Sequence, residues 1–290
     1  MTQQSSKFPA EAEVVIVGVG GIVGSMVAYW LAELGQKNIV GLEKSTIIPS
    51  DIASTAHASD FVYNTTHDKL GCWATNFSRK FYEDNGFFLK KGGLEICRKD
   101  DDARWEELKR KVESGKAFGT NIRLISASEA KEKFPLLDEE SIRGAMWDPD
   151  AGLVTPRSQD VVNFAVETAK EKGALKTYTD TPATGFEIEN GRVVGVKTDK
   201  GIIKTKKVVI ASGIWGPLMG DMDGVRVPLM PVEHPLLFFG PLPEIQGTDE
   251  LLVYPLLRDQ GNSAYVRDTG RLHGGMLEWG YYEDKEPRLV

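Results

Sequence analysis

The chain contains only two cysteines, Cys72 and Cys97, among its 290 residues. They form no Cys-x-x-Cys pair, which argues against a disulfide framework and favours a reducing compartment. No apolar run approaches the roughly 20 residues of a membrane span, and the opening MTQQSSKFPAEAE lacks the apolar core of a signal peptide. The four histidines are scattered, so we expect no metal site. These absences predict a soluble, cytoplasmic protein that does not act at a membrane.

Basic residues are outnumbered by acidic ones. The sequence has 42 acidic residues against 35 basic ones, a net charge of -7, and it has no basic block of the kind that binds nucleic acid. We therefore expect no nucleic-acid partner. A hydrophobic content of 41% and a charged content of 27% are typical of a globular protein with a substantial core.

Residues 13–43 have the pattern of a strand–helix–strand unit. EVVIVG at 13–18 has the β-branched run of a buried parallel strand, and SMVAYWLAELG at 25–35 has helical spacing of its apolar residues. NIVGLE at 38–43 predicts a second strand that ends on Glu43. The pattern predicts a βαβ unit.

The turn between strand and helix is rich in glycine. VVIVGVGGIVGS carries Gly18, Gly20, Gly21 and Gly24, close to the G-x-G-x-x-G fingerprint but with one extra residue before the last glycine. Glycines permit a tight turn, and the helix N-terminus that follows attracts a pyrophosphate. Glu43 stands where an acid binds ribose hydroxyls, which favours FAD or NAD over NADP. Strand, turn, helix, strand and acid together predict a dinucleotide site.

The rest of the chain combines a charged, helix-rich stretch with stretches of α/β and strand pattern. Residues 89–147 read as a strand and two charged helices, and residues 158–173 read as an amphipathic helix. An Asn190-Gly191 hairpin and a strand in KKVVIASG follow, and Pro-punctuated strands resume from residue 227. This order predicts two discontinuous domains, with an FAD-binding domain at 8–88 and 151–222 and a substrate domain at 89–150 and 223–290.

Several stretches resemble the D-amino-acid-oxidase superfamily of flavoproteins. They are VVIVGVGGIVGS, GLEKS, STAHAS, GGLEI, FPLLDEESIRGAMWDPDAGLVTP, KKVVIASGIWG, VPLMPVEH and SAYVRD. They look most like the dimethylglycine and sarcosine oxidase or dehydrogenase branch. The resemblance implies an α/β fold, in which a Rossmann-like, doubly wound FAD-binding domain is interleaved with an α+β substrate domain on a largely antiparallel sheet.

The resemblance also implies which residues hold FAD. Besides the glycines and Glu43, its motifs point to further contacts, namely Lys44, Ser54, Thr55, Ser212 and Gly213. In many members of this branch, a histidine in the place of His57 is joined covalently to the flavin. The composition of the loop alone would make His57 an ordinary polar residue. His67 lacks a family match, and we expect an exposed polar histidine there.

For catalysis, the resemblance points to His234 in VEHPLL and Tyr265 in SAYVRD. These residue types can take the proton that an ammonium substrate must lose before it is oxidised. A substrate carboxylate needs a cation, and Arg258 and Arg267 are both candidates. The aromatic cluster MLEWGYYED at 276–284 could form a cage for a methylated ammonium, although core packing explains it as well.

The sequence thus predicts an FAD-dependent amine oxidoreductase that demethylates a small N-methylated amino acid or tertiary amine. Electrons would pass to oxygen or to an electron-transfer protein. One alternative is a D-amino-acid or 2-hydroxyacid oxidase with non-covalent FAD. Family members run roughly another hundred residues beyond GYYEDKEPRLV, so we expect an incomplete substrate domain. A truncated, inactive flavin-binding or apo protein is therefore a further alternative.

Overall fold

The computed structural model describes residues 8–64 and 66–282. The chain divides into two compact units, each built from two segments. The first unit combines Met1–Ala58 with Pro156–Pro231, and the second combines Ser59–Thr155 with Val232–Val290. The two units differ in their bounds from the predicted domains: residues 223–231 lie in the first unit, and residues 59–88 and 151–155 lie in the second. There, β3 (Phe61–Val62) and β4 (Phe88–Lys90) both pair with β8 (Gly152–Val154).

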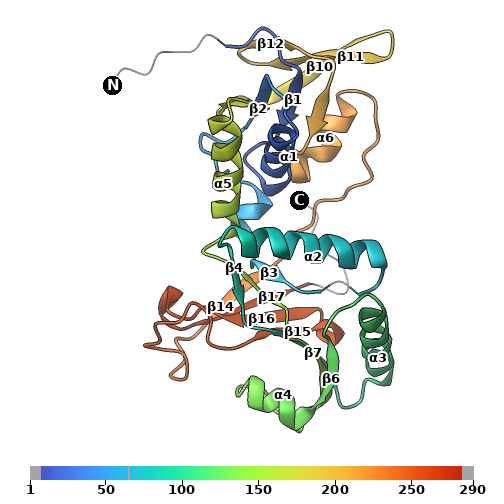
Figure 1. The fold of residues 1–290 in the computed structure, drawn as a ribbon, viewed down its shortest axis with the longest axis vertical. Helices are drawn as coiled ribbons and strands as arrows, with labels where there is room; N and C mark the ends of the chain where they lie inside the picture. Colours follow the sequence, from blue (N-terminus) through green and yellow to red (C-terminus); the bar gives the residue numbers. More distant parts are fainter. Residues whose placement is uncertain (1–7, 65, 283–290) are drawn as a thin grey trace. The chain divides into compact units, whose positions relative to one another are not determined.

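A four-stranded parallel sheet organises the first unit (Figure 1). Its order is β13-β1-β2-β9, and every neighbouring pair is parallel. The strands are β1 (Val14–Val17), β2 (Ile39–Leu42), β9 (Leu175–Tyr178) and β13 (Val208–Ile210). The predicted strands at 13–18 and 38–43 are confirmed.

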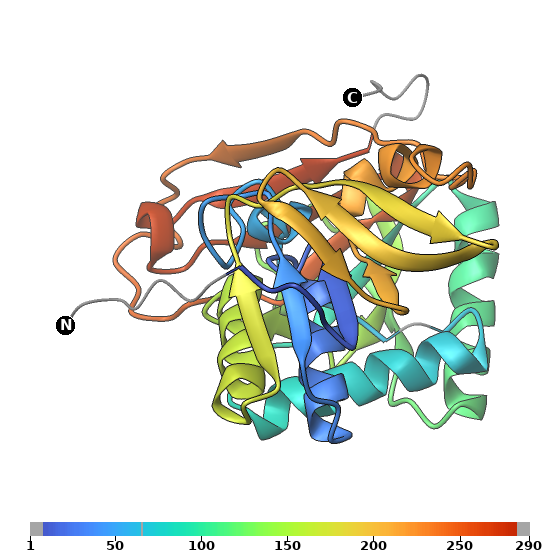
Figure 2. The same cartoon turned by 90° about the horizontal axis from the view of Figure 1, so that it is seen from above.

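Side chains of β1 alternate between the two faces of this sheet, as the period of a strand requires. Val14 and Ile16 pack on one face with α1 (Ile22–Glu33) and α5 (Ser158–Glu171). Val15 and Val17 pack on the other face, in a core that includes residues of the three-stranded sheet and α6 (Gly216–Asp221). That sheet consists of β10 (Ala183–Glu189), β11 (Arg192–Thr198) and β12 (Gly201–Lys204), drawn in gold in Figure 2.

The hairpin between β10 and β11 follows the sequence signal closely. Asn190 and Gly191 have φ angles of 51° and 72°, so both take the left-handed conformation that a tight two-residue turn requires. The strands pair antiparallel up to Glu189 and Arg192. The hairpin prediction is confirmed.

The second unit is built on a seven-stranded, largely antiparallel sheet of order β14-β17-β16-β15-β5-β7-β6. The one parallel pair within it joins β15 to β5. Its elements are α2 (Lys69–Asp84), β5 (Gly93–Arg98), α3 (Asp102–Ala117), β6 (Arg123–Ser126), α4 (Ala127–Lys133), β7 (Ile142–Asp148), β14 (Leu236–Phe239), β15 (Leu256–Asp259), β16 (Ala264–Asp268) and β17 (Leu277–Tyr281). The predicted fold class, a Rossmann-like unit interleaved with an α+β unit, is confirmed.

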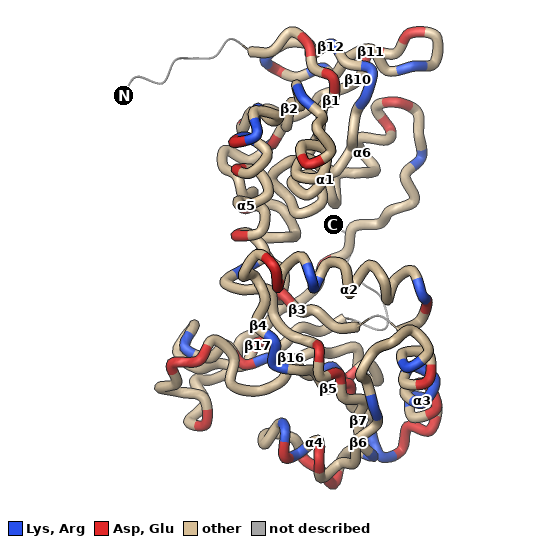
Figure 3. Tube along the Cα trace, viewed as in Figure 1, with Lys and Arg blue, Asp and Glu red and all other residues tan. Residues whose placement is uncertain are grey.

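Helices cover both faces of this sheet. Phe134, which ends α4, packs with Leu94 and Ile96 of β5, whereas Leu108 and Val112 of α3 pack with Cys97 from the opposite face. Acidic and basic residues are interspersed along α3 (Figure 3). On its inner side, the buried Lys111 Nζ lies 2.6 Å from Glu95 Oε1. This pairing satisfies a charge that would otherwise be costly to bury.

Two further features differ from the predictions. The stretch 227–240 was expected as strand, but only Leu236–Phe239 forms one, because Pro228, Pro231 and Pro235 interrupt the preceding backbone. Helix α2 was not predicted at all. Its N-cap is Asp68, whose side chain accepts a hydrogen bond from Gly71 N at 2.7 Å.

Among the described residues, no helix has the length and apolar character to cross a membrane.

Candidate functional site

The glycine turn is shaped by two close backbone approaches. Gly18 has a φ of 91°, and a Cβ atom at this position would lie 2.5 Å from the carbonyl oxygen of Ala211. A Cβ atom at Gly24 would lie 2.2 Å from the carbonyl oxygen of Gly18. The first glycine therefore lets the turn after β1 pass the turn after β13, and the second lets α1 approach the strand. Gly24 serves this packing despite the extra residue in the motif.

Glu43 holds the same turn from the end of β2. Its carboxylate is buried, and Oε2 accepts a hydrogen bond from Gly20 N at 2.9 Å. Oε1 accepts from Ser45 N at 2.9 Å and from Ser50 Oγ at 3.1 Å. A carboxylate has about four acceptor directions, so one remains for a ligand hydroxyl. Glu43 therefore shapes the turn and retains the capacity expected of a ribose-binding acid.

A pocket of about 690 Å³ opens against this turn, within the first unit. Gly18, Gly21 and Glu43 line it, and so do the other predicted contacts Lys44, Ser54, Thr55, Ser212 and Gly213. Two predicted glycines do not line it: Gly20 contacts Glu43, and Gly24 packs α1 against the turn. Eight residues predicted from four separate motifs therefore line one pocket.

The pocket residues fit a flavin dinucleotide. Ser212 Oγ is buried and has no hydrogen-bond partner among the described residues, as expected of a group that awaits a polar ligand. Thr55 Oγ1 accepts from Ile22 N at 3.1 Å and caps the first amide of α1. Lys44 Nζ lies 4.6 Å from the centre of the Trp215 ring, which fixes a cation at the wall of the pocket.

His57 lies at the end of a short 3₁₀-helix, η1 (Ser54–His57), and its side chain is exposed. It is not among the residues that line the pocket, although Thr55 is. The backbone on both sides of it is held by Arg157, whose Nη2 donates to the carbonyl oxygens of Ala56 at 3.3 Å and Ala58 at 3.2 Å. The imidazole therefore projects from a braced segment.

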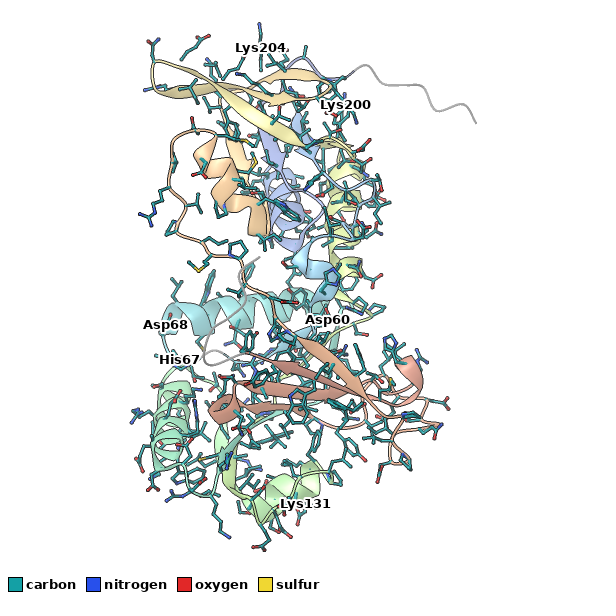
Figure 4. The ribbon with its side chains drawn as sticks, turned by 180° about the vertical axis from the view of Figure 1, so that it is seen from behind. Asp60, His67, Asp68, Lys131, Lys200 and Lys204 are labelled. Atoms are coloured by element: carbon teal, nitrogen blue, oxygen red, sulfur yellow. The ribbon has the colours of Figure 1, made fainter. Side chains whose placement is uncertain are left out.

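His67 has a different setting, in the second unit. It is exposed and precedes Asp68, the N-cap of α2; both residues are labelled in Figure 4. This position agrees with the expectation of an exposed polar histidine.

The two predicted catalytic residues meet in the second unit. His234 Nε2 lies 3.0 Å from the Tyr265 hydroxyl oxygen, and the His234 ring stacks on Tyr282 with centroids 3.9 Å apart. Burial lowers the pKa of His234, and the backbone of Tyr281 partly opposes this effect. Burial raises the pKa of Tyr265. Both shifts favour the uncharged forms, an imidazole and a phenol, which together can accept one proton.

The structure distinguishes the two arginine candidates. Arg267 is buried and pairs with Glu278, whose Oε2 accepts from Nη2 at 2.6 Å and from Nε at 3.0 Å. Arg258 lies opposite Tyr265 in the β15–β16 ladder and forms no ion pair with a described carboxylate. Its guanidinium lies 4.0 Å from the centre of the Tyr63 ring. Arg258 is therefore the cation that remains available to a ligand.

The proposed aromatic cage does not form as one group. Trp279 lies opposite Val266 in the β16–β17 ladder, so its side chain projects to the sheet face opposite to that of Tyr265. Tyr282 instead stacks on His234. Of the three acids in this stretch, Glu278 is paired with Arg267, and Glu283 and Asp284 lie outside the described residues.

Sequence reasoning missed two residues that contact the candidate pair and the free arginine. Ser59 Oγ donates to the Tyr265 hydroxyl at 2.9 Å, and Tyr63 is the aromatic platform under Arg258. Ser59 and Tyr265 are 206 residues apart in sequence. No local pattern signals such a contact, although both new residues lie in the polar loop that drew attention to His57.

The chain is similar to several known proteins. The family model described as FAD dependent oxidoreductase (DAO) matches residues 13–288. Human mitochondrial sarcosine dehydrogenase is 29% identical over 96% of this chain, and human mitochondrial dimethylglycine dehydrogenase is 30% identical over 98%. The chain spans 30% and 32% of the lengths of these two relatives. The crystal structure of L-proline dehydrogenase from P. horikoshii has a TM-score of 0.81 and 31% identity, with 96% of this chain and 73% of that chain covered.

Gly280 provides a test of how tightly the phenol is held. A Cβ atom at residue 280 would lie 1.9 Å from the Tyr265 ring, so Gly280→Ala must displace this ring. We expect a loss of about 1–3 kcal/mol in the free energy of unfolding, the usual cost of overpacking. Urea denaturation followed by circular dichroism measures it. Gly185→Ala in β10 is the matched control, because its nearest contact is 3.6 Å away; equal losses in both variants would contradict the placement of Tyr265.

Proposed function

Since the chain belongs to the DAO family of FAD-dependent oxidoreductases, we propose that it oxidises the C–N bond of a small N-methylated amino acid and releases formaldehyde. The observation that carries this proposal is the hydrogen-bonded His234–Tyr265 pair, with Arg258 opposite Tyr265 and in no ion pair with a described carboxylate. A proton acceptor and a carboxylate receptor on one sheet face suit an amino-acid substrate. The names of the sarcosine and dimethylglycine dehydrogenase relatives support the N-methyl group.

The residues would act in the following way. Arg258 would bind the substrate carboxylate through charge-assisted hydrogen bonds. The ammonium would lose its proton to Tyr265, which would pass its own phenolic proton to His234 Nε2, and the nitrogen lone pair would become free. Bound FAD supplies the two-electron oxidation, in which a hydride leaves the carbon beside nitrogen. Water then adds to the resulting iminium carbon and releases formaldehyde and the demethylated amine.

A formaldehyde assay tests the reaction. We expect the FAD-loaded protein to release one formaldehyde per electron pair from dimethylglycine or sarcosine, with either oxygen or an artificial electron acceptor present. Hydrogen peroxide formation would identify oxygen as the acceptor, and its absence would favour an electron-transfer protein. His234→Gln should lower kcat/KM by about 10²–10⁴-fold while the flavin content stays unchanged. A flavin-loaded protein that forms no formaldehyde from either amine would refute demethylation.

A second candidate substrate class is a cyclic secondary amino acid. The similarity to L-proline dehydrogenase favours it, because that similarity covers 73% of the solved chain. The same three residues would bind and deprotonate such a substrate, but its oxidation releases no formaldehyde. Reduction of the acceptor by proline without formaldehyde therefore separates the two candidates.

We further propose that FAD is attached covalently at His57. Three observations support this proposal: His57 follows the pocket residue Thr55 by two positions, its imidazole is exposed, and its backbone is braced by Arg157. A neutral imidazole is a competent nucleophile near neutral pH. The alternative is non-covalent FAD in the same pocket.

Acid precipitation tests the attachment. We expect the yellow colour and the flavin fluorescence to remain in the protein pellet, and mass spectrometry to place the adduct on the peptide that contains His57. His57→Ala should release the flavin to the supernatant, whereas His67→Ala, an exposed histidine of the second unit, should not. Release of flavin from the unsubstituted protein would eliminate the covalent link and leave the non-covalent alternative.

The choice of Arg258 as carboxylate receptor gives a separate prediction. Arg258→Leu should raise KM for dimethylglycine by roughly 10- to 100-fold, because hydrogen bonds to charged groups contribute about 1.5–3 kcal/mol. KM for dimethylethanolamine, which lacks the carboxylate, should change little. Arg192→Leu, at an exposed site on β11, is the control. A parallel rise of KM for both amines would show that Arg258 does not recognise the carboxylate.

A further inference from the structure

Ser59 completes a chain of three hydroxyl and imidazole groups in the second unit. Its Oγ donates to the Tyr265 hydroxyl at 2.9 Å, and the same hydroxyl lies 3.0 Å from His234 Nε2. Among the described residues, these two are the hydrogen-bond partners of the phenol. Phe61 packs edge-on against the Tyr265 ring with centroids 5.1 Å apart, and the backbone of Gly280 abuts the same ring. The ring is thus held in place, and the direction of its hydroxyl proton remains to be set.

We propose that Ser59 is a positioning residue for proton transfer, because its hydroxyl directs the phenolic proton of Tyr265 toward His234. This inference rests on the proposed function of the pair. A phenol oxygen has one proton and two acceptor sites. Ser59 fills one acceptor site, the proton points to His234 Nε2, and the second acceptor site remains for a substrate ammonium.

The same hydrogen bond assists the transfer itself. As Tyr265 hands its proton to His234, negative charge develops on the phenol oxygen, and a donor aimed at that oxygen is worth more than in the resting state. The proton then moves from the ammonium nitrogen to the phenol oxygen, and the phenol is restored. The net change is one proton from the substrate to His234, with no change at Ser59.

The electrostatic surroundings leave Ser59 a distinct role. Burial raises the pKa of Tyr265, and the hydrogen bond from Ser59 opposes this rise. The other charged or titratable groups that face the phenol from neighbouring elements are His234, Tyr282, Arg258, and the ion-paired Arg267 and Glu278. Arg267 and Glu278 compensate each other, so Ser59 is the neutral donor that acts on the phenol directly.

The first test measures the titration of the Tyr265 phenol in the absence of catalysis. We would record ¹⁹F NMR titrations of the full chain labelled with 3-fluorotyrosine and assign residue 265 through its loss in Tyr265→Phe. In Ser59→Ala the fluorophenol at 265 should titrate at higher pH than in the unsubstituted protein. Ser59→Thr should restore the original titration, because it keeps the donor. Ser141→Ala, which removes an exposed hydroxyl bound to Asp138, should leave the titration unchanged.

The second test measures the pH dependence of kcat/KM. In Ser59→Ala the acid limb of the kcat/KM profile for the amine should move to higher pH, with rates below the limb lowered about tenfold, which corresponds to about 1.4 kcal/mol. Flavin content should not change. An unshifted fluorine titration and an unshifted acid limb in Ser59→Ala would overturn the inference, and so would failure of Ser59→Thr to restore both. If the unsubstituted protein oxidises no amine, the proposed function fails, whereas the fluorine titration still supports or overturns the action of Ser59 on Tyr265.

Discussion

The buried carboxylate of Glu43 is the constraint on which the nucleotide-binding half of this protein depends. It ties the glycine turn after β1 to the end of β2 through the Gly20 amide, and it gathers Ser45 and Ser50 in the segment that follows. Charge-assisted hydrogen bonds of this kind are among the stronger ones in proteins. The wall of the pocket is therefore preorganised before a ligand arrives, since the loop entropy is lost on folding and not on binding.

The second unit places Arg258 and the hydrogen-bonded Tyr265 on the same sheet face and leaves Arg258 without an ion pair among the described residues. Strand register does this. Arg258 stands opposite Tyr265, while Arg267 is neutralised by Glu278 two positions further along. A slip of one residue in either strand would turn the functional side chains to the opposite face. The register of β15, β16 and β17 is thus as important to the site as the identity of its side chains.

Local signals accounted for what could be predicted from the sequence. The β1–α1–β2 unit, the acid at the end of β2 and the Asn190-Gly191 hairpin each follow from residues close together in the chain. The pairing of β3 and β4 with β8 could not be predicted in this way, because it depends on contacts between distant segments, and it moved the domain boundary to Ser59. Helix α2 was missed, although Asp68 is a good N-cap for it.

In the candidate site, too, the sequence identified single residues, whereas the contacts between them depend on the fold. Family motifs pointed to His234 and Tyr265 separately, and their 3.0 Å contact is a property of the fold. The choice between Arg258 and Arg267 depended on which residue each guanidinium contacts, and the sequence alone does not reveal these contacts. Ser59 ends the motif STAHAS, but its role was not predicted, because its contact with Tyr265 joins residues 206 positions apart.

The hydrogen bonds from Arg157 to the carbonyl oxygens of Ala56 and Ala58 have a kinetic consequence for His57. A nucleophile on a mobile loop must find its target by random search, whereas one on a clamped backbone meets a bound partner at high effective molarity. The clamp restrains the main chain on both sides of the imidazole and leaves its side-chain torsions to adjust. Under the proposed attachment of FAD at His57, bond formation would therefore need little further ordering of the main chain.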